Sequence, residues 1–386
     1  MSSLTSIYLD HAATTPMLPE AIAAYAEAAG AGPVNPSSLH AFGRSARSRV
    51  TAARDALAES LGCSPAEIVF TGSGTESDNA ALFGAAEVQR ARGRDGIVAT
   101  AVEHPAVLNA CRALEKRGFR LTLLQPDETG RVSAEDAARA IDGRTAVVSI
   151  MAGNNETGTR QPFEEIGEIA RTQGAAMHVD AVQAFGYERW DLQKLPVDLL
   201  SISAHKIGGP QGVGLLFIRR GTPFEPLLHG GNQERSRRAG TENVAGIAAF
   251  AAAARSTFAG LEEKVRRVEA VRAAFLSGLS RELGEEAFRI NGNEHFRLPH
   301  IVNVSFQGIS SETMLMNLDL AGVAASGGSA CSSGSLQPSH VLSAMKLSPD
   351  RVRNAVRFSF GLGNTREEAE KTALIIATIS ARLRIT

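Results

Sequence analysis

The sequence has few cysteines and no long apolar run, and each shortage excludes a class of protein. Only three of the 386 residues are cysteine, and none of them forms a C-x-x-C pair, so a disulfide framework is not expected. No apolar stretch approaches the ~20 residues needed to cross a bilayer. The chain start, MSSLTSIYLD, lacks the regions of a signal peptide. We therefore expect a soluble, cytoplasmic protein without membrane contact.

The charge balance and the missing nucleotide motifs narrow the choice of ligand. The chain has 40 Lys and Arg residues against 41 Asp and Glu residues. Such a chain presents no general field to nucleic acid or to an anionic membrane, and we expect direct binding to neither. No G-x-x-x-x-G-K-[ST] loop occurs, and the glycine-rich run at residues 208–214 does not fit G-x-G-x-x-G.

Short apolar runs alternate with helical patterns between residues 67 and 218. The runs lie at residues 67–72, 96–101, 120–124, 145–151, 175–180, 197–203 and 212–218. Such alternation predicts βαβ units and a mostly parallel sheet with helices on both faces. The last two runs are too close together for a crossover helix, so we expect them to pair as a hairpin.

The last third of the chain has a different pattern. A long helical stretch at residues 243–285 precedes apolar runs at residues 300–306 and 354–360. We therefore expect an α/β fold with a large domain over residues 15–260 and a smaller α+β domain over residues 261–386. Residues 1–14 are expected to pack near the active site or the small domain.

Chemically active side chains follow five of the expected strands. They are Thr75, His104, Asn155, Asp180, Gln183, Ser203, His205 and Lys206. Ligands of open parallel sheets bind beyond the carboxyl ends of the strands, so these residues predict a catalytic site at that edge. The turn TGSGTES at residues 71–77 has two interpretations: a capping box that begins a helix, and a helix N-terminus that binds phosphate.

Lys206 stands at the mouth of a buried strand and is followed by several glycines. Burial would lower the pKa of its amine and make it nucleophilic, and glycine allows the backbone to approach a ligand. Asp180 ends another strand, where its carboxylate could face the ring nitrogen of pyridoxal phosphate. We therefore interpret Lys206 as the covalent anchor of that cofactor. No metal site is expected.

The motifs around these residues resemble the class V aminotransferase superfamily of pyridoxal-phosphate enzymes. Within it, the cysteine desulfurases of the NifS/IscS type are similar in YLDHAATTP, NPSSLH, TGSGTES, EHPAV, NNETG, HVDAVQAFG, SISAHKIGGPQGVG, RAGTEN, SGGSACSSGSLQPSHV and VRFSFG. The resemblance covers nearly the whole chain. It implies the type I pyridoxal-phosphate fold, like that of aspartate aminotransferase, and a homodimer. It also implies L-cysteine as substrate and a sulfur-acceptor protein, such as an iron–sulfur scaffold, as partner.

The resemblance also gives roles to the matching residues. Lys206 would bind the cofactor covalently, Asp180 would pair with the pyridine nitrogen, Gln183 would contact the phenolic oxygen, and His104 would stack on the ring and move protons. The remaining contacts to the phosphate and substrate would come from Gly74, Thr75, Ser203, His205, Thr241, Asn155 and Arg357.

Two of these roles have structural alternatives. Thr241 would reach the phosphate bound in the other subunit, but it would serve equally well as the N-cap of the following helix. Arg357 would bind the substrate carboxylate with Asn155, but its alternation with apolar neighbours also suits an arginine on a sheet face.

Cys331 determines the expected reaction. Its neighbours, ASGGSACSSGS, are mostly glycine and serine and cannot pack a core, whereas Cys63 and Cys111 suit structural positions. An ordinary thiol is only ~3% ionised at pH 7, so the site must supply a base or a cation, and His104 is the candidate. The resemblance implies that Cys331 takes the sulfur of cysteine as a persulfide, releasing alanine.

Other reactions of the superfamily remain as alternatives. Cys331 argues against an aminotransferase or a kynureninase-like hydrolase, while a selenocysteine lyase could work without a cysteine nucleophile. A non-enzymatic iron–sulfur scaffold is disfavoured because such clusters usually need about four thiolates.

Overall fold

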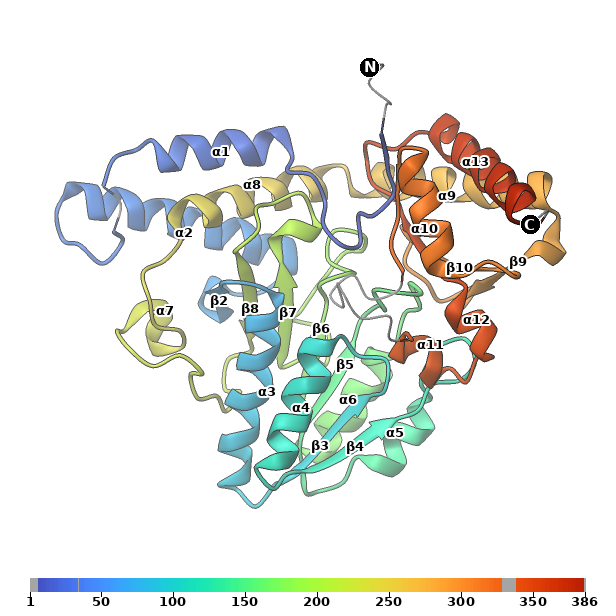
Figure 1. The fold of residues 1–386 in the computed structure, drawn as a ribbon. Helices are drawn as coiled ribbons and strands as arrows, with labels where there is room; N and C mark the ends of the chain where they lie inside the picture. Colours follow the sequence, from blue (N-terminus) through green and yellow to red (C-terminus); the bar gives the residue numbers. More distant parts are fainter. Residues whose placement is uncertain (1–5, 34, 328–337, 385–386) are drawn as a thin grey trace.

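A seven-stranded mixed sheet forms the centre of the molecule. The computed structural model describes residues 6–33, 35–327 and 338–384. The strands run in the order β2-β8-β7-β6-β5-β3-β4, as shown in Figure 1. Their bounds are β2 Ile68–Thr71, β3 Gly96–Thr100, β4 Arg120–Leu124, β5 Thr145–Met151, β6 Ala176–Asp180, β7 Leu199–Ser203 and β8 Gly214–Ile218. The expectation of a mostly parallel sheet is confirmed, since only β8 runs antiparallel to its neighbours, β7 and β2. The predicted hairpin is the β7–β8 pair.

Both faces of this sheet are covered by helices because its strands are apolar on both sides. Val69 packs in one core with α3 (Gly74–Arg90) and α4 (Pro105–Lys116). Its neighbours Ile68 and Phe70 point to the other face and share a core with α2 (Ala41–Leu61), α6 (Phe163–Gln173) and α8 (Val244–Ala259). The period of two along a strand produces this division.

The long helical stretch expected at residues 243–285 is two helices, so that prediction was wrong in one respect. Helix α8 ends at Ala259, and α9 (Leu261–Leu283) continues from Gly260 at an angle of 77°. Glycine weakens a helix at this point because it has the greatest backbone freedom. Within the described residues, no single helix is long and apolar enough to cross a membrane; the bent α8–α9 pair together has sufficient length and apolar composition.

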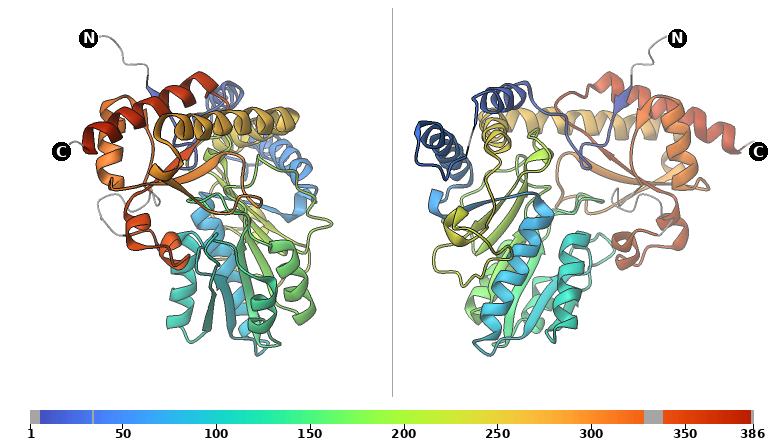
Figure 2. Two further views of the ribbon diagram at one scale, coloured as in Figure 1. Left: turned by 90° about the vertical axis from the view of Figure 1, so that its right-hand side faces the viewer. Right: turned by 60° about the vertical axis from the view of Figure 1, so that its left-hand side comes forward.

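A second core is built around a three-stranded antiparallel sheet. Its strands are β9 (Phe288–Asn291), β10 (Ile301–Phe306) and β12 (Ala355–Ser359), in the order β12-β10-β9. Helices α9 and α13 (Arg366–Arg384) lie side by side over it in both views of Figure 2. The helices α10 (Ser311–Leu320), α11 (His340–Ala344) and α12 (Pro349–Arg353) complete this part.

The N-terminal segment joins this second core rather than the large sheet. Strand β1 (Ile7–Tyr8) pairs with β11 (Val323–Ala324), and Ile7 and Leu9 are buried with the side chains of β10 and β12. The chain then passes toward the large sheet and forms α1 (Pro19–Ala29), which packs along α8. The exact domain boundaries stay a prediction.

Candidate active site

A cavity of about 180 Å³ lies where the carboxyl ends of the parallel strands face the second core. Ten residues singled out from the sequence line it: Gly74, Thr75, His104, Asn155, Asp180, Gln183, Ser203, His205, Lys206 and Arg357. The rule that ligands bind beyond the carboxyl ends of parallel strands therefore predicted correctly that these residues lie together. The role of each residue stays a prediction. Thr241 does not line this cavity, and Cys331 lies outside the described residues.

The N-terminus of α3 closes one end of the cavity. Ser73 caps the helix by accepting a hydrogen bond from the Glu76 amide at 3.1 Å. The reciprocal half of the expected capping box is missing, because the Glu76 carboxylate instead accepts from Gly72 at 2.8 Å and pairs with Arg238. The first amides of the helix and its dipole remain directed at the cavity, which suits an anion.

Gly74 is placed so that β7 and the turn after β6 can approach this helix terminus. A Cβ at Gly74 would lie 2.8 Å from Cγ2 of Val182 and 3.4 Å from Cβ of Ser203. The Ser203 hydroxyl is buried and has no hydrogen-bond partner among the described residues. A buried hydroxyl in this state is expected to bond a ligand.

Asp180 ends β6 and is buried. Burial raises the pKa of its carboxyl to about 6, although the Val182 amide at 2.9 Å and the charge of Lys206 both lower it. Asp78 of α3 also lines the cavity, and its pKa is raised well above the ordinary value by burial and by Asp180. Two carboxyl groups this close cannot easily both ionise, so we assign the proton to Asp78 and the negative charge to Asp180.

Sequence reasoning missed Asp78 because it lies inside a helical pattern. The sequence feature that could have indicated Asp78 is its charge, because the same helix face otherwise carries alanine and leucine, such as Ala81 and Leu82. Its neighbour His178 is buried between the hydroxyl groups of Ser149 and Ser201, at 2.8 and 2.9 Å. Burial lowers the pKa of His178 to about 3, so this histidine is neutral.

Lys206 lies in a 3₁₀ turn, Ala204–Lys206, directly after β7. Its Nζ donates to the main-chain oxygens of Ala12 and Ala13, at 2.6 and 2.8 Å. Gln183 donates to the same Ala12 oxygen at 2.9 Å. The N-terminal segment therefore forms one wall of the cavity.

Two of the glycines after Lys206 are required by packing within the protein. A Cβ at Gly208, where φ is +82°, would lie 2.6 Å from Cγ of Leu18, and one at Gly209 would lie 2.9 Å from the Ala204 side chain. These contacts fix the turn that carries Lys206.

The two cavity histidines are held neutral. His104 caps α4, and its Nδ1 accepts from the Ala106 amide at 3.2 Å, so the ring proton is at Nε2. Burial, followed by the charge of Lys206, lowers the pKa of both His104 and His205 to about 4. His104 is therefore a weak base and is better suited to donating a hydrogen bond through Nε2.

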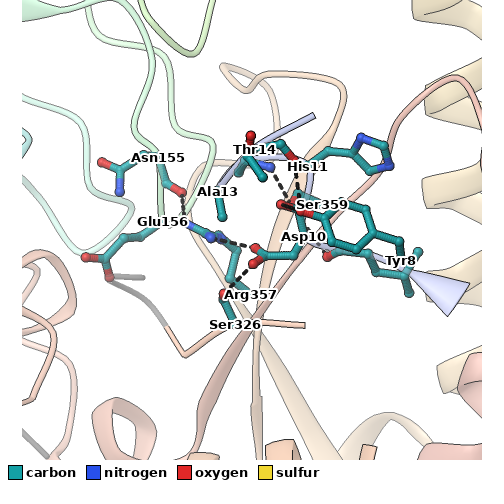
Figure 3. A network of polar contacts seen from close by, with 12 residues as sticks. Tyr8, Asp10, His11, Ala13, Thr14, Asn155, Glu156, Ser326, Arg357 and Ser359 are labelled. Atoms are coloured by element: carbon teal, nitrogen blue, oxygen red, sulfur yellow. Dashed lines mark hydrogen bonds and ion pairs between the residues drawn. The ribbon is translucent and has the colours of Figure 1, made fainter. Parts of the chain in front are cut away.

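Arg357 points from β12 into the cavity and is 1% exposed. Its Nη1 donates to the main-chain oxygen of Asn155 at 2.9 Å, and its Nη2 donates to Asp10 at 2.7 Å, as Figure 3 shows. The amide oxygen of Asn155 is buried without a hydrogen-bond partner among the described residues. Arginine and amide groups together are suited to a small carboxylate ligand.

The remaining candidates lie elsewhere. Thr241 is exposed, and the N-cap of α8 is Asn243, which accepts from the Gly246 amide at 3.0 Å. The interpretation of Thr241 as that N-cap was therefore wrong. Burial raises the pKa of the Cys63 and Cys111 thiols to about 12, so neither is reactive at neutral pH.

The family model described as aminotransferase class-V matches residues 7–372, and the chain belongs to this family. The chain is 46% identical to the putative cysteine desulfurase IscS 1 of Bacillus subtilis, over 98% of this chain and 99% of that protein. It is 42% identical to the cysteine desulfurase IscS of Methanosarcina thermophila, over 98% and 93%.

Solved structures agree with this assignment. A NifS-like protein superposes with a TM-score of 0.89 at 37% identity, covering 98% of this chain and all of that one. DndA from Streptomyces lividans gives a TM-score of 0.79 at 36% identity, covering 92% and 99%. The family and the fold predicted from the motifs are confirmed.

Proposed function

We propose that this protein is a pyridoxal-phosphate-dependent cysteine desulfurase. It would convert L-cysteine to L-alanine through a persulfide on Cys331 and donate the sulfur to an acceptor protein. The relatives named above are a putative cysteine desulfurase and a cysteine desulfurase, and one solved structure similar to this chain is that of SspA in complex with cysteine. The observation that carries the proposal is the convergence of Lys206, Asp180 and the α3 N-terminus on one cavity.

The residues of this cavity fit pyridoxal phosphate. The α3 N-terminus and the Ser203 hydroxyl suit the phosphate; Thr75 lies in the first turn of α3, and His205 lines the same cavity. The ionised carboxylate of Asp180 suits a protonated pyridine nitrogen. When bound, pyridoxal phosphate supplies a carbonyl carbon for Lys206. It also supplies an electron sink for the electron pair that stays on the α-carbon when the α-proton leaves.

The protein side chains would orient the substrate and move its protons. Arg357 and Asn155 would bind the carboxylate of L-cysteine and so set its α-hydrogen toward Lys206, whose amine would take that proton. His104 would stay neutral and donate through Nε2. Gln183, held by the Ala12 oxygen, would direct its amide toward the phenolic oxygen.

Cys331 would receive the sulfur. The Cys331 thiol would first give up its proton, and its Sγ would then attack the substrate sulfur, so that a sulfur–sulfur bond forms and the carbon–sulfur bond breaks. The electron pair of that bond passes to the carbon that becomes the methyl group of alanine, which then takes up a proton. A second attack, by a thiol of the acceptor on the outer sulfur, would restore Cys331.

The described residues on each side of Cys331 support this role. Ser326 pairs with Arg357 through two main-chain hydrogen bonds, at 2.7 and 3.2 Å. The His340 ring lies 2.9 Å from the main-chain oxygen of Glu103, next to His104. Cys331 is five residues beyond Ser326 in the sequence, and Arg357, the pairing partner of Ser326, lines the cavity.

A homodimer and a sulfur-acceptor partner complete the proposal. Thr241 is exposed and lies outside the cavity of its own chain, which suits a contact to the phosphate of a second copy. Light scattering of the purified protein tests the dimer, and Thr241→Ala should weaken cofactor binding if the contact exists.

The cofactor assignment is tested by colour and chemical reduction. The purified protein should absorb visible light, and borohydride reduction followed by peptide mapping should label Lys206. Lys206→Ala should lose the visible band, while the exposed Lys194, which pairs with Asp191 and does not line the cavity, is the matched control. A label on another lysine would contradict the assignment.

A further inference from the structure

The Asp10 carboxylate joins two parts of the chain at the rim of the cavity. Its Oδ1 accepts from Nη2 of Arg357 at 2.7 Å, and its Oδ2 accepts from the hydroxyl of Ser326 at 2.8 Å. Figure 3 shows Asp10 between these two side chains. The Arg357 side chain is 2% exposed and that of Asp10 is 16% exposed, so this ion pair is largely shielded from water.

The backbone of Asp10 is fixed from both sides. Its main-chain oxygen accepts from the Tyr8 hydroxyl at 3.1 Å and from the Ala13 amide at 3.0 Å. Ser359, two residues after Arg357 on β12, donates its amide to Leu9 at 2.8 Å and accepts from the Ala12 amide at 2.8 Å. Asp10 and Arg357 are therefore presented by backbone segments that are bonded directly to each other.

An arginine side chain has many rotamers, and its guanidinium loses hydration when it is buried. It therefore adopts a single orientation only where fixed hydrogen-bond acceptors stabilise that orientation. Asp10 and the main-chain oxygen of Asn155 are such acceptors, and they bind different nitrogens of Arg357. Two acceptors on rigid backbone fix both the position and the plane of the group. A carboxylate ligand that needs two parallel hydrogen bonds depends on that plane.

We propose that Asp10 is a positioning residue that orients the Arg357 guanidinium for the α-carboxylate of the substrate. The inference rests on the proposed function, in which Arg357 binds that carboxylate. Asp10 acts through Arg357 and contributes nothing to binding of the substrate amine or thiol. The competing explanation is that the ion pair only attaches the N-terminal segment to β12, in which case its loss would weaken all ligands alike.

The test compares two ligands that differ only in the carboxylate, with the cofactor-loaded protein. L-cysteine and cysteamine share the amine and the thiol, but cysteamine has no carboxylate. Binding of each is read from the change in visible absorption, without reference to turnover. For Asp10→Ala we expect the L-cysteine concentration at half-saturation to rise at least tenfold, while that of cysteamine changes less than twofold. Asp10→Asn, which keeps the shape and loses the charge, should give an intermediate increase for L-cysteine.

Controls separate positioning from folding. Ser326→Ala removes the other hydrogen bond of Asp10 but leaves the ion pair, and it should bind L-cysteine within twofold of the parent. The thermal unfolding midpoint and the absorption without ligand identify a variant that fails to fold, and the isosteric Asp10→Asn then carries the test. Equal weakening of both ligands, or unchanged or tighter binding of L-cysteine, would overturn the proposal. A parent protein that binds L-cysteine but forms no alanine would contradict the desulfurase function and leave the Asp10 result intact.

Discussion

The Nζ of Lys206 donates a hydrogen bond to the main-chain oxygen of Ala12 over a distance of 2.6 Å. This contact joins the expected cofactor anchor, which follows β7 of the large sheet, to a segment that pairs with the C-terminal core. Gln183 uses the same oxygen. The cavity is thus closed only when the N-terminal segment, the large sheet and β12 are together, so its chemistry depends on contacts between distant parts of the chain.

Replacing Asp180 with Ala should slow alanine formation about 10²–10³-fold, because the protonated pyridine nitrogen would lose its fixed counter-charge. In the cofactor-free protein burial raises the pKa of Asp180 to about 6, so pyridoxal phosphate should bind more weakly as the pH drops through that value, because the protonated acid cannot hold the pyridinium charge. Alanine formation by the variant, and titration of the cofactor-free parent with pyridoxal phosphate from pH 5 to 8, check the two expectations. Borohydride labelling of Lys206 should persist in the variant, and near-parental turnover would refute this role.

Replacing Gly74 with Ala should weaken cofactor binding by about tenfold. The new Cβ would lie 2.8 Å from Val182, whose side chain lines the cavity between Asp180 and the α3 N-terminus, and something must shift. The measurement is titration of the cofactor-free protein with pyridoxal phosphate. Gly143→Ala is the matched control, because a Cβ there meets no atom within 4 Å. Equal affinities of the two variants would show that the approach of Val182 and Ser203 to the helix is unimportant.

Glu103 allows a stability prediction with a definite sign. Burial raises its pKa from 4.5 to about 8, so the folded chain holds a proton that the unfolded chain releases above pH 4.5. Its contribution therefore lowers the stability of the cofactor-free protein as the pH rises from about 4.5 to 8. Glu103→Gln keeps an oxygen for the Met151 amide and the Thr100 hydroxyl and removes the titration. At pH 8 it should be more stable than the parent by about 4 kcal/mol.

At pH 4.5 the advantage of Glu103→Gln should nearly vanish, since both folded chains are then neutral at this position. Denaturant unfolding at the two pH values measures the difference. A gap that is the same at both, or that reverses, would show that Glu103 is not a buried acid with a raised pKa.

Much of the site could be predicted from the sequence because parallel strands bring their carboxyl ends to one edge. That rule and the motifs placed Lys206, Asp180 and their neighbours together without any knowledge of packing. Asp10 could not be assigned a partner in the same way. Its contact with Arg357 depends on the pairing of Asp10 with Ser359, a register between the two ends of the chain that no local pattern encodes.

The helical stretch that bends at Gly260 shows a second limit. Residues on both sides of Gly260 have the composition of one helix, and a single glycine is compatible with a continuous helix at a cost of about 1 kcal/mol. Helix α8 packs against α1 and helix α9 packs against α13, and the two helix axes must therefore point in different directions. This tertiary packing causes the bend at Gly260.

The central claim is that Cys331 takes the sulfur from L-cysteine, and Cys331→Ala tests it most directly. The variant should retain the cofactor and still change its visible absorption when L-cysteine is added, because none of the described cavity residues is altered. Cys63→Ala and Cys111→Ala are the matched controls, and both should keep parental turnover, with a modest loss of stability where the thiol is buried.

The decisive measurement is the rate of alanine formation from L-cysteine with a reductant, beside mass spectrometry of the protein for one added sulfur atom. We predict that the parent and both control variants form alanine and carry the added sulfur, and that Cys331→Ala does neither. Alanine formation by Cys331→Ala at the parental rate would contradict the persulfide route. A lyase that releases sulfur or selenium without a cysteine nucleophile would then be the better description.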